Sequence, residues 1–552
     1  MLFDIQNLNV SFQQTKVLRN FSLQLKTNTI LGIVGESGSG KSLSVLSILN
    51  LLPKMATLEV NKMCFDGKDL KNADENLKRK LRGHDISIIF QEPMSSLNPS
   101  MTCGEQVSEI LLNHKICRRK QIKDKVLELF EKVKLPTPAQ TFKKYPHQIS
   151  GGQKQRVMIA MAIACKPKLL IADEPTTALD VSVQQEIILL LKQLQEETEM
   201  SIIFISHDLA LVKNIANEIM VLYKGQVIEQ GKTESVFYKP KESYTKALLA
   251  ARPKPNERLV RLPTIIDFKK ENFKIEIESK AERSILHEKL YDQKPLIEIK
   301  NLNKTFKVNS SLFKSPSFFK ALDNINFDLY EGEKLGVVGE SGCGKTTLGH
   351  IITGLTKADS GVINYHNQDI RSLKPKDFKK IKKDIQIIFQ DPYSSLNPRI
   401  SIGKSITEPM KVHSLYKTKK DREQKAMELL EAVGLSKAHY NRFPHEFSGG
   451  QRQRIGIARC LALQPKVIIC DESVSALDIS VQAQVLNLLE DLKKEYNLTY
   501  IFISHDLSVV RQFSDRIIVM QSGKIVEYGE ADDLYNCPKT DYTKQLIEAI
   551  PV

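Results

Sequence analysis

The chain has 552 residues, which at roughly 100–200 residues per domain is too long for a single hydrophobic core. Hydrophobic residues make up 41 % of it and charged residues 26 %, as in an ordinary soluble protein, and no apolar run approaches the ~18 residues of a membrane span. Lysine and arginine exceed aspartate and glutamate by 80 to 65, but the basic runs are short and lack interleaved aromatic residues, so we expect solvated helix faces or residence near acidic lipid rather than binding of nucleic acid.

The N-terminus and the cysteines bear on the compartment. The start, MLFDIQNLNV, has neither the basic region nor the apolar region of a signal peptide, so none is expected. The eight cysteines are scattered without C-x-x-C spacing, so neither a zinc ribbon nor a disulfide framework is expected. This usage fits a reducing cytoplasm.

The motifs of this sequence occur twice. GESGSGKS recurs as GESGCGKT, and three later motifs recur with a constant offset of 298 residues, as between Ser150 and Ser448. Such repetition predicts two homologous domains, 1–250 and 296–552, joined by a linker at 251–295.

Two segments have no counterpart in the other half. Residues 251–295 are rich in charge and open with prolines, which indicates a linker with one short helix. The second half also carries an insertion, NSSLFKSPSFF at 309–319. Its composition suggests a surface loop, and a loop that rests on a partner and a merely floppy loop fit it equally well.

Short apolar runs in the first half end directly at polar motifs. They are ILGIV before the glycine loop, ISIIF before Gln91, LLIA before Asp173 and IIFIS before His207. Such runs, separated by helical patterns, are typical of buried parallel strands, so we expect an α/β domain around a parallel sheet. The segments at about 100–147 and 399–445 are predicted to form an inserted helical subdomain in each half.

The two glycine loops match G-x-x-x-x-G-K-[ST], follow a strand and precede a helix, which is the context of a phosphate-binding P-loop. Lys41 and Lys345 are expected to reach the β- and γ-phosphates, while Ser42 and Thr346 offer a hydroxyl to Mg²⁺. A chance glycine turn is the alternative for a lone match, and a second match in the same context makes it remote. Cys343 is expected to be a small filler residue rather than a redox switch. The candidate nucleotide-binding residues of the loops are Gly35, Glu36, Ser37, Gly38, Ser39, Gly40, Lys41, Ser42, Gly339, Glu340, Ser341, Gly342, Cys343, Gly344, Lys345 and Thr346.

Two adjacent carboxylates end an apolar strand in each half. Consecutive strand residues face opposite ways, so Asp173 and Glu174 are expected to have different roles. The aspartate is the usual P-loop partner of Mg²⁺, which leaves Glu174 to polarise the attacking water. Asp471 and Glu472 repeat the pair. Two acids that merely end a strand are the alternative, and the neighbouring P-loop weighs against it.

A histidine and a glutamine each follow an apolar strand in both halves. A lone histidine is more often structural than catalytic, but His207 and His505 lie in identical FISHDL hexapeptides, which favours contact with the γ-phosphate. Gln91 and Gln390 can reach Mg²⁺ or the attacking water through the side-chain amide.

A further pair of motifs, ISGGQKQR and FSGGQRQR, runs into helical sequence. A serine and two glycines at the start of a helix can hold an anion, because backbone N–H groups and the helix dipole point outward. The chain therefore has four candidate phosphate-binding motifs: the two P-loops and the two serine–glycine motifs.

The order of these motifs resembles the ATP-binding-cassette ATPases, and the likeness covers both halves from end to end. It implies two P-loop ABC ATPase domains in tandem, each with a mostly parallel sheet, an antiparallel portion and the helical subdomain. In that family two cassettes meet head to tail, and each SGGQ grips the γ-phosphate of the ATP on the other P-loop. The likeness thus implies two composite sites, Lys41 with Ser448, Gly450 and Gln451, and Lys345 with Ser150, Gly152 and Gln153.

Four more residues take their roles from this resemblance alone. Phe12 and Phe306 occupy the position at which an aromatic residue stacks on adenine. Asp180 and Asp478 match the loop that joins the two sites.

Departures from the family pattern are mild. Ile149 and Phe447 replace the leucine usual before SGGQ, and Thr177 replaces a serine. None of these changes removes a catalytic group, so we expect two hydrolytically competent sites.

The residues after the glutamine distinguish classes of tandem cassettes. QEPMSSLNP and QDPYSSLNP resemble the oligopeptide, dipeptide and nickel importer ATPases, as do YTKALL and YTKQLI at the ends of the halves. The fused form is similar to the single-chain ATPase of bacterial peptide and microcin C uptake systems. The cysteine- and proline-rich tail of many unfused members is missing, so no iron–sulfur site is expected.

Two other classes of tandem cassette match the sequence less well. A tandem-cassette translation factor acting on ribosomes would suit the positive charge, but it should carry a long continuous helical linker, which 251–295 with its prolines matches poorly. A tandem-cassette DNA-repair ATPase should carry C-x-x-C pairs, which this sequence lacks.

The resemblance also implies cofactors and partners. They are ATP and Mg²⁺, two integral-membrane permease subunits and, indirectly, a substrate-binding protein, with no nucleic acid. The two cassettes would form an intramolecular pseudo-dimer, peripheral on the cytoplasmic face of the cell (inner) membrane. The sequence does not specify the transported substrate.

Overall fold

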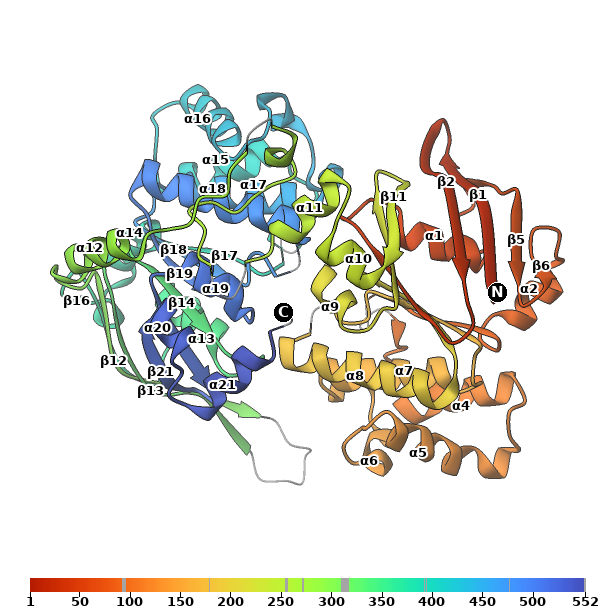
Figure 1. The fold of residues 1–552 in the computed structure, drawn as a ribbon. Coiled ribbons are helices and arrows are strands. Elements are labelled where there is room, and N and C mark those ends of the chain that lie inside the picture. Colours follow the sequence, from red (N-terminus) through yellow and green to blue (C-terminus); the bar gives the residue numbers. More distant parts are fainter. Residues whose placement is uncertain are drawn as a thin grey trace. The chain divides into compact units, whose positions relative to one another are not determined.

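The structure is a computed structural model that describes residues 1–91, 96–177, 179–253, 257–270, 273–308, 317–391, 393, 395–475 and 477–550. The chain divides into two compact units, the first built mainly from residues 1–250 and the second mainly from residues 272–550 (Figure 1). Of the insertion predicted at 309–319, residues 309–316 lie outside the described residues.

The first unit contains two sheets. Strands β1 (Phe3–Phe12), β2 (Thr15–Leu25), β4 (Ala56–Glu59), β5 (Lys62–Phe65) and β6 (Lys68–Asp69) form an antiparallel sheet of order β2-β1-β5-β6, with β4 also on β1. Strands β3 (Ile30–Val34), β7 (Ile86–Ile89), β8 (Leu169–Asp173), β9 (Ser201–Ser206), β10 (Glu218–Tyr223) and β11 (Gln226–Lys232) form the second sheet, of order β11-β10-β3-β9-β8-β7. Only β11 runs antiparallel there.

The second unit repeats this plan. Its antiparallel sheet has the order β13-β12-β15-β16, from strands β12 (Ile297–Val308), β13 (Ser317–Leu329), β15 (Ser360–Tyr365) and β16 (Gln368–Asp369). Its larger sheet has the order β17-β18-β19-β14-β20-β21, from strands β14 (Lys334–Val338), β17 (Ile385–Ile388), β18 (Val467–Asp471), β19 (Thr499–Ile503), β20 (Arg516–Gln521) and β21 (Lys524–Glu530). The predicted α/β class, with a mostly parallel sheet and an antiparallel portion in each half, is confirmed.

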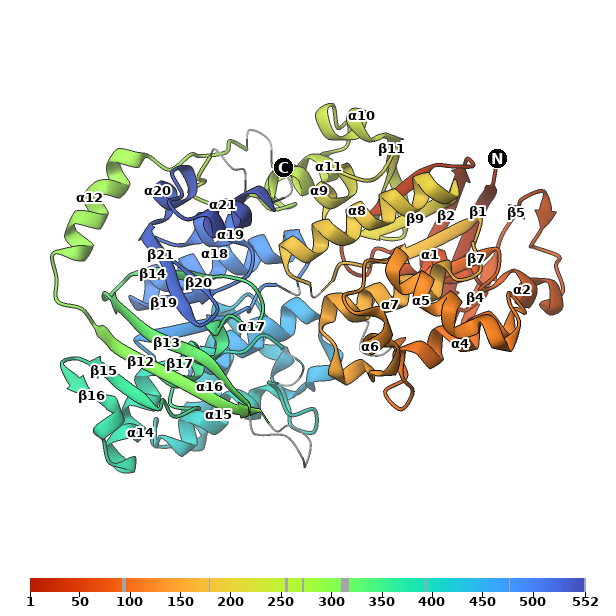
Figure 2. The ribbon, with the colours of Figure 1, turned by 90° about the horizontal axis from the view of Figure 1, so that it is seen from below.

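Helices connect and cover these strands (Figure 2). In the first unit they are α1 (Lys41–Ile48), α2 (Glu75–Leu81), α4 (Cys103–Asn113), α5 (Ile122–Lys132), α6 (Pro138–Lys143), α7 (Gly151–Ile163), α8 (Val181–Thr198), α9 (Leu209–Lys213), α10 (Thr233–Tyr238) and α11 (Ser243–Ala250). In the second unit they are α12 (Lys280–Tyr291), α13 (Lys345–Ile352), α14 (Pro375–Asp384), α15 (Ile402–Val412), α16 (Lys419–Ala432), α17 (Gly449–Leu461), α18 (Ile479–Tyr496), α19 (Leu507–Phe513), α20 (Ala531–Asn536) and α21 (Asp541–Glu548). Helices α4 to α6, and α15 with α16, lie in the two segments predicted to be helical.

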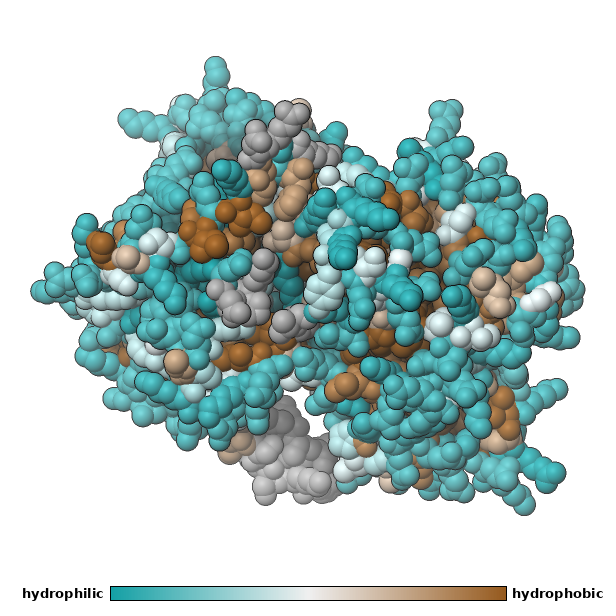
Figure 3. Space-filling model, viewed as in Figure 1, coloured by the Kyte–Doolittle hydropathy of each residue, from teal (hydrophilic) through white to brown (hydrophobic). Residues whose placement is uncertain are grey.

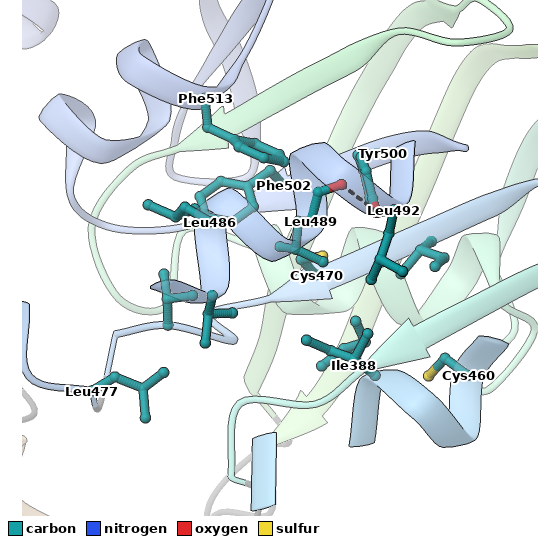
Figure 4. Packing of buried hydrophobic residues seen from close by; sticks show 14 of the residues in the cluster. Ile388, Cys460, Cys470, Leu477, Leu486, Leu489, Leu492, Tyr500, Phe502 and Phe513 are labelled. Carbon is teal, nitrogen blue, oxygen red and sulfur yellow. Dashed lines mark hydrogen bonds between the residues drawn. The ribbon is translucent and has the colours of Figure 1, made fainter. Parts of the chain in front are cut away.

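Each larger sheet is the centre of its unit's core. Every residue of β3, β8 and β9 is buried, as expected for strands covered on both faces. In the second unit, Cys470 and Phe502 from neighbouring strands pack in one cluster with Leu486 and Leu489 of α18 (Figure 4). This packing holds the ends of the parallel strands, and hence the motifs that follow them, at one edge of the sheet.

Most of the segment predicted as a linker belongs to the second unit. Residues 251–264 and those from 272 onward are part of it, whereas 265–271 belong to the first. Leu262 N donates to Asn487 Oδ1 at 3.0 Å, and Asn487 Nδ2 donates to Leu262 O at 2.8 Å. The segment contains α12 and a 3₁₀ turn at Asp267–Lys269 where one short helix was predicted.

None of the helices in the described part of the chain is long and apolar enough to span a bilayer. The face drawn in Figure 3 is mostly hydrophilic, with smaller apolar areas between the polar side chains.

Candidate active site

The predicted P-loop of each unit lies between the central strand and the first helix of the parallel sheet. The residue before each helix, Gly40 with φ 103° or Gly344 with φ 110°, has a left-handed conformation that favours glycine. This turn brings the start of α1 or α13 against the loop. The lysine that begins each helix is almost fully buried, with exposed fractions of 5 % for Lys41 and 4 % for Lys345.

Each lysine side chain lies back over its own loop. Lys41 Nζ donates to the carbonyls of Gly35 at 2.8 Å and Glu36 at 3.0 Å. In the second unit Lys345 Nζ makes the corresponding bonds at 2.6 and 2.9 Å. The ammonium group is therefore held at the mouth of the loop, where phosphate oxygens can compete with the two carbonyls.

The hydroxyl and carboxylate expected to hold a metal ion are brought together. Ser42 Oγ donates to Asp173 Oδ1 at 3.2 Å, and Thr346 Oγ1 donates to Asp471 Oδ1 at 3.0 Å. Burial, with the charge of Glu174 beside it, raises the pKa of Asp173 to about 6 against the hydrogen bond from Ser42. The pKa of Asp471 is raised for the same reasons.

The neighbouring glutamate does not follow the alternation expected of a strand. Strand β8 ends at Asp173, and Glu174 has φ 47°, a left-handed conformation that is unusual outside glycine. Glu472 has φ 46° in the same position. The turn, rather than the strand, directs each carboxylate to the P-loop lysine, at 3.6 Å from Lys41 Nζ and 4.0 Å in the second unit.

The glutamine and histidine predicted for the site meet at this glutamate. Gln91 Nε2 donates to Glu174 Oε2 at 2.9 Å, and His207 Nδ1 lies 3.3 Å from the same oxygen. Gln390 donates to Glu472 Oε2 at 2.7 Å, and His505 Nδ1 lies at 3.7 Å from it.

These contacts set the charge of the glutamate. Burial alone would raise the pKa of Glu174, but the hydrogen bond and charge of His207, together with Lys41, outweigh it and lower the pKa to about 2. The pKa of Glu472 is also lowered. In each unit, neighbouring carboxyl groups therefore have pKa values moved in opposite directions, as expected for groups with different tasks.

The serine–glycine motif starts a helix in both units, as predicted. Ser150 Oγ accepts the N–H of Gln153 at 3.3 Å, and Gln153 Oε1 accepts the N–H of Ser150 at 3.3 Å. A Cβ on Gly152 would lie 2.8 Å from Val183 Cγ1, so this glycine lets α7 pack against α8. Ser448, Gly450 and Gln451 repeat the arrangement at the start of α17.

The two aromatic candidates differ in exposure. Phe12 ends β1 and is half-buried against the core of the antiparallel sheet. Phe306 is 40 % exposed, with Lys304 Nζ at 5.2 Å from the centre of its ring. Asp180 and Asp478 are the residues that precede α8 and α18.

Three further contacts at the site come from residues for which the sequence predicted no role in it. Thr177 was noted only as a departure from the family pattern, yet its Oγ1 donates to Glu174 Oε2 at 3.1 Å. Tyr244 and Tyr542 contact the two P-loops through their hydroxyl groups. The signal available for the tyrosines was the recurrence of YTK at the end of both halves.

The oxygen donors of each unit suit a hard divalent cation. Hydroxyl, carboxylate and amide oxygens from Ser42, Asp173 and Gln91 are of the type that Mg²⁺ accepts when phosphate oxygens and water complete its shell. Within the described ranges no cluster of three or more His, Cys, Asp or Glu residues could hold a metal by itself. The donors thus fit an ion that arrives with a nucleotide.

Comparison with protein families agrees with this geometry. The family described as "ABC transporter" matches residues 18–177 and again residues 322–475. The family described as "Oligopeptide/dipeptide transporter, C-terminal region" matches 228–273 and 526–552. Both matches occur once in each half.

Similar proteins span nearly the whole chain. The glutathione import ATP-binding protein GsiA of Escherichia coli (strain K12) is 43 % identical over 561 residues, covering 99 % of this chain and 89 % of the relative. The protein of the same name from Shigella dysenteriae serotype 1 (strain Sd197) gives the same values. A solved dimeric ATP-binding cassette in a post-hydrolysis state with ADP and Pi is 30 % identical, with 43 % of this chain and 98 % of that chain covered and a TM-score of 0.38.

The hypothesis of a ribosome-acting factor finds no support among these relatives, since those named are transporter subunits. The full set of P-loop, carboxylate, glutamine and histidine contacts is present in both units. The chain belongs to the ABC transporter family, as a pair of fused cassettes of the oligopeptide/dipeptide type that bind and hydrolyse ATP to drive transport through membrane permease partners.

Proposed function

We propose that this chain powers the import of a peptide or a peptide-like substrate. The observation that carries the proposal is the likeness to glutathione import ATPases over 99 % of the chain, which includes the C-terminal region typical of oligopeptide and dipeptide transporters. Glutathione is itself a short peptide, so both comparisons point to the same substrate chemistry. A substrate-binding protein would deliver the substrate, and the chain would sit at the cytoplasmic face of the membrane against two permease subunits.

Within each cassette, Glu174 and Glu472 are the groups proposed to polarise the attacking water. The charge of Lys41 helps to keep Glu174 ionised, which makes it a weak base. A γ-phosphate that draws Lys41 from the loop carbonyls offsets this charge, so the pKa of Glu174 rises and its carboxylate accepts a proton more readily. Gln91 and His207 hold the same carboxylate in place while this happens.

A bound Mg²⁺ would be held by Ser42 and Asp173 in the first cassette and by Thr346 and Asp471 in the second, with Gln91 and Gln390 near enough to contribute. When bound, it supplies positive charge that stabilises the transferring phosphate. The protein's own part is to keep a carboxylate and a hydroxyl side by side before the ion arrives.

The serine–glycine turn of one cassette is proposed to complete the ATP-binding site of the other. Lys41 would then share a site with Ser448, and Lys345 with Ser150, while Phe12 and Phe306 stack on the adenines and Asp180 and Asp478 join the sites. Closure around ATP and reopening after hydrolysis would drive the permease, because the bridging γ-phosphate makes contacts in only one of the two states. The domains at 1–250 and 296–552 would be the two moving bodies.

The pairing of the sites can be tested by counting trapped nucleotides. In a Glu174→Gln/Glu472→Gln background, which is expected to abolish turnover and retain ATP, Lys41→Ala with Ser448→Arg damages one composite site and should leave about one ATP per chain. Lys41→Ala with Ser150→Arg damages both sites and should leave none. Equal stoichiometry in the two double variants would contradict the exchange of motifs between cassettes.

The transport role can be tested by purification from detergent. The intact chain should bring down two permeases, and its ATPase should respond to the loaded substrate-binding protein when the complex is placed in vesicles. ATP-dependent, salt-sensitive association with ribosomes instead of permeases would contradict the proposal.

A further inference from the structure

A tyrosine from the C-terminal region of each cassette contacts the P-loop of the same unit. Tyr244, in the first turn of α11, accepts the N–H of Glu36 on its hydroxyl at 3.1 Å. Tyr542, in the first turn of α21, accepts the N–H of Glu340 at the same distance. Both tyrosines are nearly buried, with exposed fractions of 7 % and 9 %. The contact therefore occurs independently in two repeats of different sequence.

The N–H that the tyrosine holds belongs to a peptide group whose carbonyl holds the P-loop lysine. The peptide between Gly35 and Glu36 donates its N–H to Tyr244, while its carbonyl accepts Lys41 Nζ at 2.8 Å. A peptide group is planar, so fixing its N–H also fixes the direction of its carbonyl. The hydroxyl thus determines where the lysine acceptor points.

Close packing against the neighbouring strand also restricts the backbone at this peptide group. Gly35 has φ 156°, and a Cβ there would lie 2.3 Å from Leu222 O. Gly339 has φ 150°, and a Cβ there would lie 2.2 Å from Met520 O. The backbone passes so close to the neighbouring strand that a rotation of the peptide would alter the whole loop.

The tyrosine helix is itself anchored to the edge of the sheet. Glu229 of β11 accepts the N–H groups of Lys241 at 2.9 Å and Glu242 at 3.2 Å, just before α11 begins. Glu527 of β21 accepts those of Lys539 at 2.8 Å and Thr540 at 3.1 Å before α21. A continuous set of contacts therefore leads from the edge strand through the helix to the P-loop.

We propose that Tyr244 and Tyr542 are positioning residues for nucleotide binding, through which the C-terminal region of each cassette keeps the P-loop in the conformation that receives phosphate. The inference rests on the proposed assignment of the two P-loops. Each hydroxyl is engaged by a backbone N–H of the loop, so the tyrosines are expected to act on the nucleotide through the loop rather than by direct contact. Their loss is expected to weaken ATP binding and leave the chemical step unchanged, since bound phosphates re-impose the loop conformation.

The test uses the full chain with Tyr244→Phe, Tyr542→Phe and both together, and measures the Kd of ATP, the KM and the kcat. Losing a hydrogen bond to a buried N–H should raise Kd and KM about five-fold at the affected site, with kcat within about two-fold of the unchanged chain. Phenylalanine keeps the ring, so packing is preserved.

Tyr500→Phe is the matched control. Its hydroxyl donates to Leu489 O at 3.1 Å deep in the core of the second unit and away from the loop (Figure 4). Tyr500→Phe should lower the thermal midpoint about as much as Tyr542→Phe without changing the Kd of ATP. Equal rises in Kd for Tyr500→Phe and Tyr542→Phe would overturn the inference, because the effect would then be a general loss of stability.

Lys41→Ala with Lys345→Ala separates this inference from the assignment beneath it. If the lysine pair abolishes tight ATP binding and the tyrosine pair changes neither Kd nor KM, the tyrosine inference is wrong and the P-loops stand. If the lysine pair also binds ATP normally, the P-loop assignment is wrong and the tyrosine inference falls with it.

Discussion

The two cassettes share their catalytic contacts but differ at the far end of the central strand. Asn217 Oδ1 in the first unit accepts the N–H of Ile30 at 2.8 Å, and Asp515 Oδ2 in the second accepts the N–H of Lys334 at 2.9 Å. The bond is the same, but Asn217 is exposed to solvent whereas Asp515 is only 9 % exposed. The same position of the repeat thus holds an exposed neutral amide in the first unit and a buried carboxylate in the second.

A buried carboxylate needs cations and hydrogen-bond donors, and both the second cassette and the segment between the cassettes supply them. His287 Nε2 lies 3.6 Å from Asp515 Oδ1, and Arg283 donates to the carbonyls of Ser514 and Asp515 at 3.3 Å each. Burial alone would raise the pKa of Asp515, but the charge of Lys334, a hydrogen bond from His287 and the charges of Lys493 and Arg258 hold this pKa far below its usual range. The two cassettes therefore share the contacts of the candidate active site, whereas a position that is exposed in the first unit is part of the interior of the second.

The largest effect should appear where the cassettes are alike. Lys41→Ala and Lys345→Ala should each remove most of the steady-state ATPase activity, by about 100-fold or more, because each deletes a charge that faces the phosphates. Steady-state phosphate release measures it. Lys125→Ala, which removes a partly exposed lysine paired with Glu128 away from the P-loops, serves as control. Near-normal turnover in one lysine variant would show that the two sites are not equivalent.

Next in size is a stability effect confined to the second unit. Arg283 is buried and pairs with Asp532 and with Glu530 at 2.5 Å, so Arg283→Ala should lower the free energy of unfolding of that unit by about 3–5 kcal/mol. Denaturant unfolding followed by hydrogen exchange in each unit measures it.

The control for this change is a linker arginine on the surface. Arg261 bonds Asp491 through both nitrogens at 2.9 and 3.0 Å, but its side chain is 58 % exposed. Arg261→Ala should cost under about 1 kcal/mol. Equal losses for both arginines would show that burial is not the cause.

Smaller effects on stability are expected when the side chains at positions 217 and 515 are exchanged between the units. Asp515→Asn should destabilise the second unit by about 1–3 kcal/mol, because it removes a charged hydrogen-bond acceptor. Asn217→Asp should change the first unit by less than about 0.5 kcal/mol, because that position is exposed. A large loss of stability in Asn217→Asp would mean that the position in the repeat, and not the burial of the side chain, determines the effect.

The Asp515→Asn difference should also depend on pH. A carboxyl whose pKa is lower in the folded than in the unfolded state stabilises the fold above its unfolded pKa, and that contribution is lost as the pH falls. The unsubstituted and substituted chains should therefore differ fully at neutral pH and converge as the pH drops below about 4. A difference that grows on acidification would contradict the ionised state of Asp515.

The smallest effect on stability and turnover is expected from Cys343→Ser, which gives the second P-loop the residue that the first has at Ser39. Cys343 Sγ and Ser39 Oγ occupy the same place, each 2.8 Å from where a Cβ on the first loop glycine would lie. Cys343→Ser should therefore cost less than about 1.5 kcal/mol and leave turnover in place. ATPase assays before and after treatment with a thiol reagent measure it, and strong inhibition of the unsubstituted chain that Cys343→Ser prevents would give the thiol a larger role than filling space.

Much of the fold and the candidate site could be predicted from the sequence. Apolar runs that end in polar motifs place Gln91, Asp173 and His207 at the carboxyl ends of neighbouring parallel strands, so residues far apart in the sequence had to meet near the P-loop. The conformation of Glu174 could not be predicted, because a left-handed turn after a strand has no pattern of its own. The partners of the segment at 251–295 could not be predicted for a similar reason: Asn487, for example, lies in a segment that carries no motif.

Where the chain is cut should decide whether the second cassette survives alone. The repeats suggest a division near residue 296, but that cut would remove Arg283 and His287, so that Asp532 and Asp515 would each lose a buried partner. A cut after residue 250 would keep Arg283 with Asp532 and His287 with Asp515. Any separation of this fused gene product into halves, in the laboratory or in evolution, therefore has to leave most of the intervening 45 or so residues with the second protein, in keeping with the reach of a compact domain.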